Sequence, residues 1–579
     1  MPLPQSSLIA TAFKLINPIA DWLSTWRFQI LSLLLLLQVV SFCTQGIWVE
    51  DFWEHSAAVH AFIQNPLHPG HPQFALQASH PFLNPYTFVV AQFARLFHID
   101  AISALSIFGV LNFCLFCCGL RAFIASLQLG SPSVDSSSHT KETSHAKFAS
   151  NRATTKRIAS NNNKLAFYSL LFILFLWGGK PWPYSGFFNY QIYLMNLPYP
   201  STFVGGLSLL GLALNARYQH TKHWAYLFGL IAITTLALLT HPLTAQFLLI
   251  GMAAQVFTPR STVNKPKYST LILYIKSLFL PFLKLAIISL ASLALATLWP
   301  FYPILELFQG ASKVYDTSNG DMYFHLFTRL WLFVMLAPLY IWMLLKPELR
   351  SLLIIFSVTV SIYVFGYLTE RYSFGRIISY TVIMLQITCA VAMFRFEAWA
   401  QRLAPSATRL GQLAVCVVLL ICAAQWIPTS ARRALTVTNS LWLGRTVSNQ
   451  IIYKDYLFLP NLIEKNAVVF ADIETSWLLP SFGAKVIAAK HPIAFIEATQ
   501  QRDQDVLNFF ESSASIETRA ALLKKYRAQY LLLNKNLDTN WEQIYVQFSP
   551  LSRQNKADSE QHSYQVVIFE NEKFALLKL

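Results

Sequence analysis

Charged residues are scarce in this sequence. Only 12% of its 579 residues are Asp, Glu, Lys or Arg, whereas 54% are hydrophobic. Because soluble domains carry about 25% charged residues, this composition excludes an ordinary soluble protein and predicts a chain that lies largely in a lipid bilayer. The formal net charge is nevertheless +16. Its positive residues gather in loops between apolar runs, which indicates membrane topology rather than nucleic-acid binding, so we predict no nucleic-acid partner.

Cysteine is also scarce and is confined to apolar segments. The seven cysteines lie in or beside hydrophobic runs, so no disulfide framework is predicted. Cys114, Cys117 and Cys118 fall inside one such run, where thiols pack rather than bind zinc. No glycine-rich phosphate loop opens a predicted helix, so no nucleotide site is expected. A cleavable signal peptide is not expected either, because the run Ile30 to Val40 belongs to a segment long enough to span.

Long hydrophobic runs are what the sequence has instead. A spanning helix needs about 20 mostly apolar residues. On that criterion we predict a polytopic α-helical membrane protein with about eleven transmembrane helices. They lie near 28–48, 101–125, 164–180, 200–216, 224–240, 242–257, 284–303, 328–345, 351–368, 377–394 and 410–427. The predicted transmembrane domain therefore covers 28–427.

The loops predict the orientation of these helices. The Ser/Asn-rich, basic segment 128–163 is typical of a disordered cytoplasmic linker, and Lys and Arg concentrate in other loops on the same side. This places the N-terminal segment 1–27 in the cytoplasm and, with an odd number of spans, the C terminus outside. The segment 50–100 is then a long outer loop, in which we expect two short interfacial helices.

The pattern changes after Pro428. The segment 466–489 predicts a strand, a helix and a strand, 516–534 predicts an amphipathic helix that leads into a strand, and 564–579 predicts a hairpin. We therefore predict that 428–579 forms an extracytoplasmic α/β domain.

Acidic side chains crowd the start of the outer loop, at Glu50, Asp51 and Glu54, with His55 next to them. In a helix, Asp51, Glu54 and His55 share one face. A carboxylate in a partly dry cleft can act as a general base, so we take Asp51 as the base and the other three as further catalytic candidates. Asp51, Glu54 and His55 could also bind a divalent cation, which is the one cofactor candidate. The alternative is that the acids only cap a helix amino terminus.

Three basic residues lie in loops predicted to be outside: Lys180, Arg371 and Arg376. Few positive charges are expected on that side, and arginine matches phosphate bidentately, so we predict a phosphate-binding role for them. The alternative is that Arg371 pairs with its neighbour Glu370 or with a lipid phosphate.

Aromatic residues are frequent in the same loops. Trp182 and Tyr184, with His241, are candidates for a substrate groove, because sugar rings stack on aromatic rings. Aromatic residues also favour the membrane interface, and a histidine directly before Pro242 also fits a helix cap. Both alternatives remain open.

The acidic stretch "EDFWEH" after the first span, the stretch "HPFLNPYTFVVAQFARLFHIDAISALSIFGVLNFCLF" (80–116) that runs into the second, and "VVFADIETSWLLPSFGAKVIAAKHPIAF" (468–495) resemble the GT-C membrane glycosyltransferases. That superfamily includes protein O-mannosyltransferases, aminoarabinose transferases and catalytic subunits of oligosaccharyltransferases. The chain looks most like the bacterial protein O-mannosyltransferase and aminoarabinose transferase types. It departs from them by carrying Glu-Asp in place of Asp-Glu or a spaced Asp-x-Asp, which leaves its metal dependence open.

The resemblance implies a glycosyltransferase in the bacterial cytoplasmic (inner) membrane. The donor would be a polyprenyl-phosphate-linked sugar, and the acceptor a glycan, lipid or protein of the cell envelope. Asp51 would match the family's catalytic base, and Arg371 and Arg376 would hold the donor phosphate while the anomeric centre inverts. Two other classes remain: a transporter or flippase of lipid-linked glycans, and a ligase or polymerase of preassembled glycans. Transporters are often built from repeats, and the two halves of this chain share none.

Overall fold

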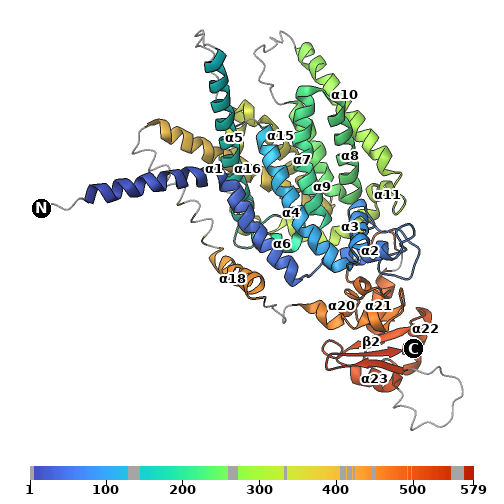
Figure 1. The fold of residues 1–579 in the computed structure, drawn as a ribbon. Helices are drawn as coiled ribbons and strands as arrows, with labels where there is room; N and C mark the ends of the chain where they lie inside the picture. The colour runs from blue at the N-terminus through green and yellow to red at the C-terminus, as the bar shows by residue number, and fades with distance from the viewer. Residues whose placement is uncertain are drawn as a thin grey trace, which may run out of the picture.

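The computed structural model of the chain describes residues 5–127, 129, 144–257, 271–331, 335–403, 413, 417, 420, 424, 426–444, 451–491, 493–496, 499–549 and 566–579. A bundle of long helices occupies one end of the molecule, and a small sheet with short helices occupies the other (Figure 1). The second element, α2, lies where the two parts meet.

Helices occupy all or part of ten of the eleven predicted spans. They are α1 (Gln5–Gln45), α4 (Ala101–Ser126), α5 (Ser144–Phe175), α7 (Pro200–Thr221), α8 (Trp224–Thr240), α9 (Pro242–Val256), α10 (Leu271–Ala296), α14 (Leu336–Leu345), α15 (Arg350–Leu368) and α16 (Ile378–Leu403). The eleventh range, 410–427, lies mostly outside the described residues.

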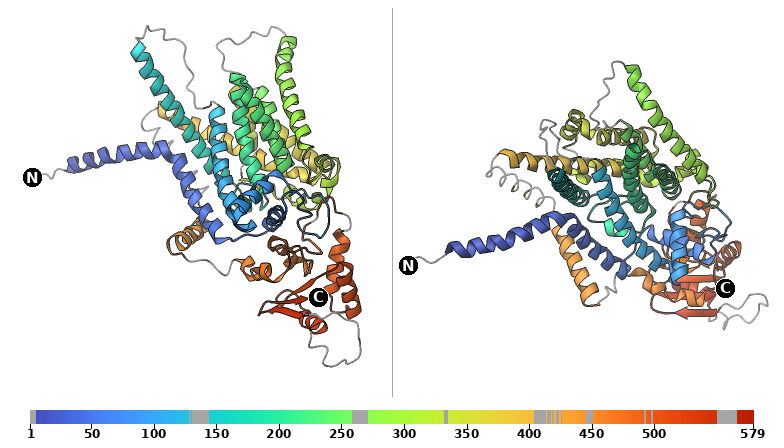
Figure 2. Two further views of the ribbon diagram at one scale, coloured as in Figure 1. Left: turned by 45° about the vertical axis from the view of Figure 1, so that its right-hand side comes forward. Right: turned by 45° about the horizontal axis from the view of Figure 1, so that its top comes forward.

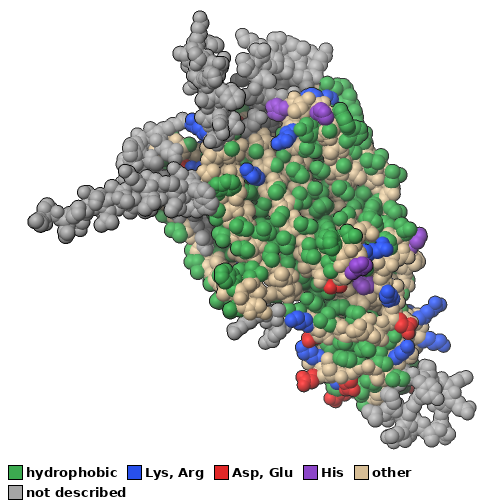
Figure 3. Space-filling view, in the orientation of Figure 1, with side chains coloured by type: hydrophobic (Ala, Val, Ile, Leu, Met, Phe, Trp, Pro, Cys, Tyr) green, Lys and Arg blue, Asp and Glu red, His purple; other side chains and the backbone are tan. Residues whose placement is uncertain are grey.

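Five described segments are long and apolar enough to cross a membrane: Thr25–Gln45, Ala101–Ser126, Leu278–Ala296, Pro347–Leu368 and Tyr372–Ala400. The surface of the bundle is correspondingly hydrophobic, whereas charged side chains gather at the end that carries the sheet (Figure 3). A surface of this kind is stable in lipid rather than in water. The chain is therefore a membrane protein with at least five candidate spans, and a total of about eleven remains a prediction.

Small residues allow the helices α4 and α7 to pack closely against each other. A side chain at Gly119 of α4 would lie 2.6 Å from the carbonyl oxygen of Gly206 on α7, so the two backbones nearly touch. Contacts between small residues are the usual way in which membrane helices pack.

Two expectations about the bundle differ from the structure. The predicted disordered linker 128–163 is helical from Ser144 onward, because α5 continues beyond its apolar half; once a helix exists, each further residue adds a hydrogen bond at little entropic expense. The predicted span 328–345 contains α13 (Leu326–Arg329) and α14, and α14 has only 10 residues. That is too short to cross a bilayer alone.

Short elements fill the loops at the end of the bundle that faces the sheet. As expected, the loop 50–100 contains two helices, α2 (Phe52–Gln64) and α3 (Pro85–Phe97), and α3 begins with a capping box between Asn84 and Thr87. The others are α6 (Tyr193–Asn196), α11 (Ile304–Gln309), η1 (Ala311–Tyr315), α12 (Asp316–Asn319), η2 (Gly320–Tyr323) and η5 (Tyr372–Ile377). The short helix η4 (Pro347–Leu349) lies at the opposite end of the bundle, before α15.

The C-terminal part contains a four-stranded sheet in the order β1-β2-β4-β3. Its strands are β1 (Val469–Phe470), β2 (Tyr530–Asn534), β3 (Val566–Glu570) and β4 (Phe574–Lys578), with β1 and β2 parallel and the other pairs antiparallel. The chain enters this part through α18 (Ile427–Val437) and the π-helical turn η6 (Thr438–Trp442), which pack beside α1. The other short helices of this part are η8 (Ile452–Tyr456), α19 (Leu459–Leu462), α20 (Ile473–Ser476), η9 (Leu479–Phe482), α21 (Thr499–Phe510), α22 (Ile516–Lys525) and α23 (Trp541–Phe548).

The predicted hairpin and the predicted helix that leads into a strand are confirmed by β3–β4 and by α22–β2. The predicted strand, helix and strand at 466–489 is only partly correct. Its first strand has two residues, and its second is a single bridge from Lys485 to Val468. The reason is that this segment leaves the sheet and packs on α2 instead.

Polar contacts hold this segment against the outer loop. Ser481 Oγ donates to the carbonyl of Trp53 at 3.1 Å, and Lys485 Nζ donates to the carbonyl of His71 at 2.7 Å. The amide of Val486 donates to the carbonyl of Gln73 at 2.8 Å. Both further views place the C-terminal part directly against the end of the bundle (Figure 2). One hydrophobic core accordingly runs from the bundle into the C-terminal part.

Candidate functional site

The candidate site begins where the first span turns into α2. Glu50 adopts a left-handed conformation (φ 58°) and reverses the chain after α1. Asp51 then sits directly before α2, and Glu54 lies in its first turn. The Asp51 side chain makes no capping hydrogen bond to the helix. Helix capping therefore does not explain why this carboxylate stands here.

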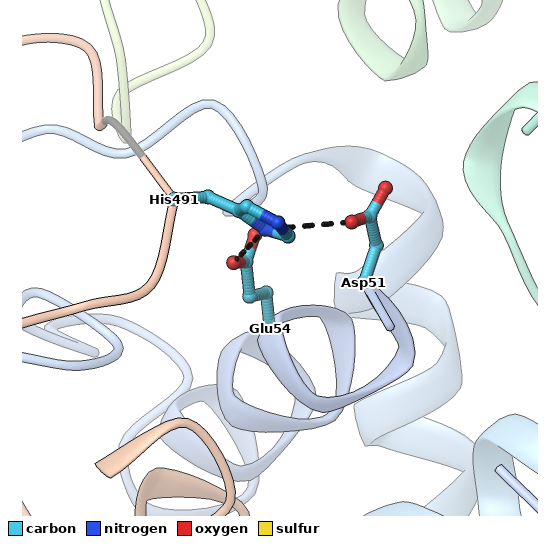
Figure 4. Close-up of side chains that lie close together, drawn as sticks. All are labelled: Asp51, Glu54 and His491. Carbon is cyan, nitrogen blue, oxygen red and sulfur yellow. Dashed lines mark hydrogen bonds and ion pairs between the residues drawn. The ribbon is translucent and has the colours of Figure 1, made fainter. Parts of the chain in front are cut away.

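A histidine from the C-terminal part completes a three-residue group with these acids (Figure 4). His491 Nδ1 lies 2.7 Å from Glu54 Oε1 and 3.5 Å from Asp51 Oδ1. Glu54 is buried, whereas 35% of the Asp51 side chain is exposed. The group thus offers one accessible carboxylate, one buried carboxylate and one imidazole.

His491 is held in its charged form. Burial alone would lower its pKa, but the hydrogen bond to Glu54 and the charges of Glu54, Asp51 and Glu50 outweigh burial and raise the pKa of His491 to about 9. At neutral pH the ring is therefore an imidazolium that donates Nδ1–H to Glu54. It neutralises part of the negative charge that the two acids bring together.

Trp477 provides a second hydrogen bond to the buried carboxylate of Glu54. Its indole Nε1–H donates to Glu54 Oε1 at 3.2 Å, and its ring meets the His491 ring edge-on at 5.2 Å. The ammonium of Lys490 lies 4.2 Å from the Trp477 ring and pairs with Glu474 at 2.8 Å. A buried acceptor that receives two donors is oriented and rarely moves.

Asp51 has a different environment from Glu54. Burial and then the charge of Glu54 raise the pKa of Asp51, while His491 and Arg376 oppose that rise. A carboxylate with raised proton affinity that remains accessible is suited to accept a proton from a bound hydroxyl group.

Arg376, in the last turn of η5, contributes a positive charge that acts on Asp51. Its Nε donates to Asn319 Oδ1 at 2.8 Å, its Nη1 donates to Ser185 Oγ at 2.8 Å, and its guanidinium lies 5.5 Å from the Tyr184 ring. Within the described residues it forms no ion pair. Its positive charge is therefore positioned by neutral groups and remains available to an anion.

The other two predicted phosphate ligands lie elsewhere. Arg371 Nε pairs with Asp316 Oδ2 at 3.0 Å, so its partner is neither Glu370 nor a member of the group around Asp51. The side chain of Lys180 is exposed, and its backbone amide bonds to the carbonyl of Thr328 at 3.1 Å. Of the three predicted basic residues, Arg376 is the one whose charge opposes the rise of the Asp51 pKa.

The three residues predicted to line a substrate groove, Trp182, Tyr184 and His241, also lie in different environments. Tyr184 lies beside Arg376, and its role in a groove stays a prediction. Trp182 is fully buried with the Arg329 guanidinium 5.5 Å from its ring, so its ring does not line an open groove. His241 caps α9, because its Nδ1 accepts from the amide of Thr244 at 3.3 Å, which is the alternative that the sequence left open.

His55 does not belong to the cluster of potential metal ligands. Its ring packs 4.3 Å from Phe82 and 5.4 Å from Tyr199. Burial, with His241 and His80 nearby, lowers the pKa of His55 to about 3, so it stays neutral. His491 takes the place that the sequence assigned to His55.

The group fits a divalent cation in its chemistry. One ligand atom each from Asp51, Glu54 and His491 lies within 4.8 Å of the others. Two carboxylates and one imidazole suit first-row transition metals. Because a ligating histidine must be neutral, such an ion would replace the proton on Nδ1 of His491.

Sequence reasoning missed His491 and Trp477. His491 lies 437 residues after Glu54 in the chain, and no local spacing connects them. One signal was present: His491 is one of only two histidines after residue 428, the other being His562.

Comparison with known proteins gives a weak likeness in structure. No protein-family model matches the chain, and no curated protein matches it either. Part of its fold is similar to the oligosaccharyltransferase of Archaeoglobus fulgidus in its complex with Zn and sulfate, at 12% identity, with 88% of this chain and 69% of that chain covered and a TM-score of 0.40.

The oligosaccharyltransferase AglB of the same organism, in complex with an inhibitory peptide and a dolichol-phosphate, gives 12% identity, coverage of 91% and 71%, and a TM-score of 0.45. At these values the likeness assigns neither a family nor an activity to the chain.

Proposed function

We propose that the chain is a membrane glycosyltransferase that moves a sugar from a polyprenyl-phosphate-linked donor to a hydroxyl group of a cell-envelope acceptor. One observation carries the proposal: the accessible carboxylate of Asp51 lies beside the Glu54–His491 pair and feels the charge of the Arg376 guanidinium, which forms no ion pair among the described residues. A base and an anion-binding cation near each other are what transfer from a sugar phosphate requires. The resemblance of the acidic stretch to GT-C enzymes points the same way.

The chemistry follows from the positions of the two groups. The acceptor oxygen attacks the anomeric carbon as Asp51 takes its proton. The bond from that carbon to the phosphate oxygen breaks, and the polyprenyl phosphate leaves with the electron pair. Arg376 stabilises the negative charge that grows on the leaving phosphate. A single displacement of this kind inverts the anomeric centre.

Glu54 and His491 position the base in this scheme. The His491 imidazolium holds Glu54, and together with Trp477 it keeps the acid directed away from the acceptor. When a divalent cation is bound, Asp51, Glu54 and His491 would hold it, and it would add positive charge near the donor phosphate.

The proposal is tested by replacing Asp51 with Asn in the full chain in proteoliposomes. Release of polyprenyl phosphate and formation of the glycosylated product are followed by mass spectrometry, with a panel of polyprenyl-phosphate monosaccharides and an envelope extract as acceptor source. We expect Asp51→Asn to lower turnover by about 10²–10⁴-fold, as loss of a general base does. The matched control Glu306→Gln removes another exposed acid, on α11, and keeps wild-type turnover.

Three results would overturn parts of this proposal. Wild-type turnover in a folded Asp51→Asn variant would remove the assignment of the base. Movement of the lipid-linked sugar across the bilayer without transfer would identify a flippase, and joining of preassembled glycans would identify a ligase or polymerase. The orientation belongs to the proposal as well: the amino terminus in the cytoplasm of a bacterial cell, and the group around Asp51 and the C-terminal part outside the inner membrane.

A further inference from the structure

The segment α18–η6, residues 427–443, exposes its hydrophobic side. Trp442 is 84% exposed and Leu435 is 65% exposed, and Ile427, Leu441 and Leu443 are exposed as well. No residue of α18 or η6 is buried. Isolated exposed leucines need no explanation, but five large apolar side chains within one short segment do.

The polar side of the same segment faces the protein. Ser440 Oγ hydrogen-bonds with Ser41 Oγ on α1, and the Gln45 side-chain amide donates to the carbonyl of Thr436 at 3.4 Å. Arg433 donates to the carbonyl of Gln191 at 3.0 Å, and its guanidinium lies 4.4 Å from the Tyr190 ring. A surface helix of a soluble protein buries its apolar side and exposes its polar side. This segment does the opposite: its polar side contacts the protein and its apolar side is exposed.

The surroundings of the exposed side are apolar too. The segment packs beside the end of α1 (Figure 1). On α1, Leu33, Leu34 and Leu37 are exposed within a segment that can cross a membrane. The apolar side of α18–η6 thus continues the surface that α1 presents to lipid.

The composition of the segment fits the boundary of a bilayer. Tryptophan is enriched at membrane interfaces, and Trp442 is the most exposed of the large apolar side chains of the segment. Arg432 is exposed at its edge, and residues 426–444 contain no acidic residue. Arginine without acidic neighbours is attracted to lipid phosphates.

We propose that α18–η6 lies in the bilayer interface, with Leu435 and Trp442 between the lipid chains and Arg432 among the phosphates. The occupant of the exposed side is phospholipid, not a second copy of the chain or another protein. The segment would then hold the start of the C-terminal part at the membrane surface. This inference does not depend on the proposed function.

Photo-crosslinking of the full chain tests the proposal. The photoreactive residue p-benzoylphenylalanine replaces Trp442 or, separately, Leu435, and each variant is reconstituted in vesicles of phosphatidylethanolamine and phosphatidylglycerol. Leu34 on α1, which is 55% exposed, serves as the lipid-facing reference, and Val546 on α23, which is 56% exposed, serves as the matched position away from the bundle.

We expect phospholipid adducts at 442 and 435 in yields within about threefold of that at 34, and at least tenfold above that at 546. Adduct masses identify the partner directly. Cross-links to a second copy of the chain, or yields at 442 and 435 no higher than at 546 while 34 reacts with lipid, would overturn the proposal. Each variant is also checked for wild-type elution in size-exclusion chromatography, so that a misfolded chain is not counted as a result.

Discussion

Asp51 and Glu54 lie one helical turn apart, yet they have opposite environments. Glu54 is buried and receives hydrogen bonds from His491 and Trp477, whereas Asp51 stays accessible with its nearest partner, His491, at 3.5 Å. The difference arises because Trp477 and His491 both hydrogen-bond with Glu54, whereas the contact of His491 with Asp51 is longer. A covered acid is suited to hold a cation, and an accessible one is suited to meet a substrate.

This difference predicts how the group binds a cation. We expect the wild-type chain to bind Mn²⁺ or Zn²⁺, and His491→Gln to weaken that affinity at least tenfold, because a metal-ligating imidazole is lost. Isothermal titration calorimetry of the detergent-purified protein measures the affinity. His68→Gln is the matched control, since His68 is an exposed histidine of the same outer loop. Equal affinities for the wild type and His491→Gln would show that the imidazole is not a ligand.

At the scale of elements, the parallel strands β1 and β2 bring two further acids together. Asp472 follows β1 and Asp538 follows β2, and the carboxyl ends of parallel neighbours lie at the same edge of a sheet. Burial and then the charge of Asp472 raise the pKa of Asp538 to about 7 from its usual 3.8. Asp538 Oδ2 still accepts from the amide of Asn534 at 2.9 Å.

The raised pKa predicts how the stability of this sheet depends on pH. Because the folded state holds the Asp538 proton more tightly than the unfolded state, the stabilisation is complete below pH 3.8 and is lost as pH rises through about 7. Asp538→Asn keeps the acceptor oxygen and removes the charge.

We expect that variant to be more stable than the wild type at about pH 8, on the order of 2–4 kcal/mol, and to lose this advantage at about pH 4. Thermal unfolding at both pH values checks it. An unchanged difference between the two chains at both pH values would contradict the assignment of the proton to Asp538.

How much of these elements the sequence could predict depends on where their stability comes from. Apolar runs and the final hairpin were predictable, because the hydrophobic effect and turn chemistry act locally. The helix in the second half of the linker was not predictable, because this Ser/Asn-rich segment forms one helix, α5, with the apolar residues that follow it. The structure of the segment after β1 was not predictable either, because Ser481 and Lys485 hydrogen-bond to α2 and to the outer loop rather than to a sheet.

At the scale of the whole molecule, the same rule decides what could be known of the site. Asp51, Glu54 and Arg376 follow from residue type and predicted topology. His491 does not, because only the docking of the C-terminal part on α2 brings it to Glu54. The site is thus a product of the interface between two parts of the chain, and its integrity should depend on that interface.

Gly483 lies at the centre of this interface and gives the sharpest test. A side chain added there would lie 2.9 Å from His60 Nε2 and 3.2 Å from Gln64 Nε2, both on α2, and the backbone has a positive φ of 94°. We expect Gly483→Ala to push the ends of the His60 and Gln64 side chains aside and to loosen the docking of the C-terminal part, so that amide hydrogen exchange in α2 becomes faster and transfer becomes slower than in the wild type.

The variant Gly444→Ala controls for backbone strain. Gly444 also has a positive φ, of 59°, but no atom lies within 4 Å of a side chain added there. This variant therefore introduces the backbone strain of about 1 kcal/mol without a new contact to α2. If both variants changed exchange in α2 equally, strain and not docking would be responsible. If neither changed it, the docked parts would accommodate a side chain at position 483 by moving the ends of His60 and Gln64.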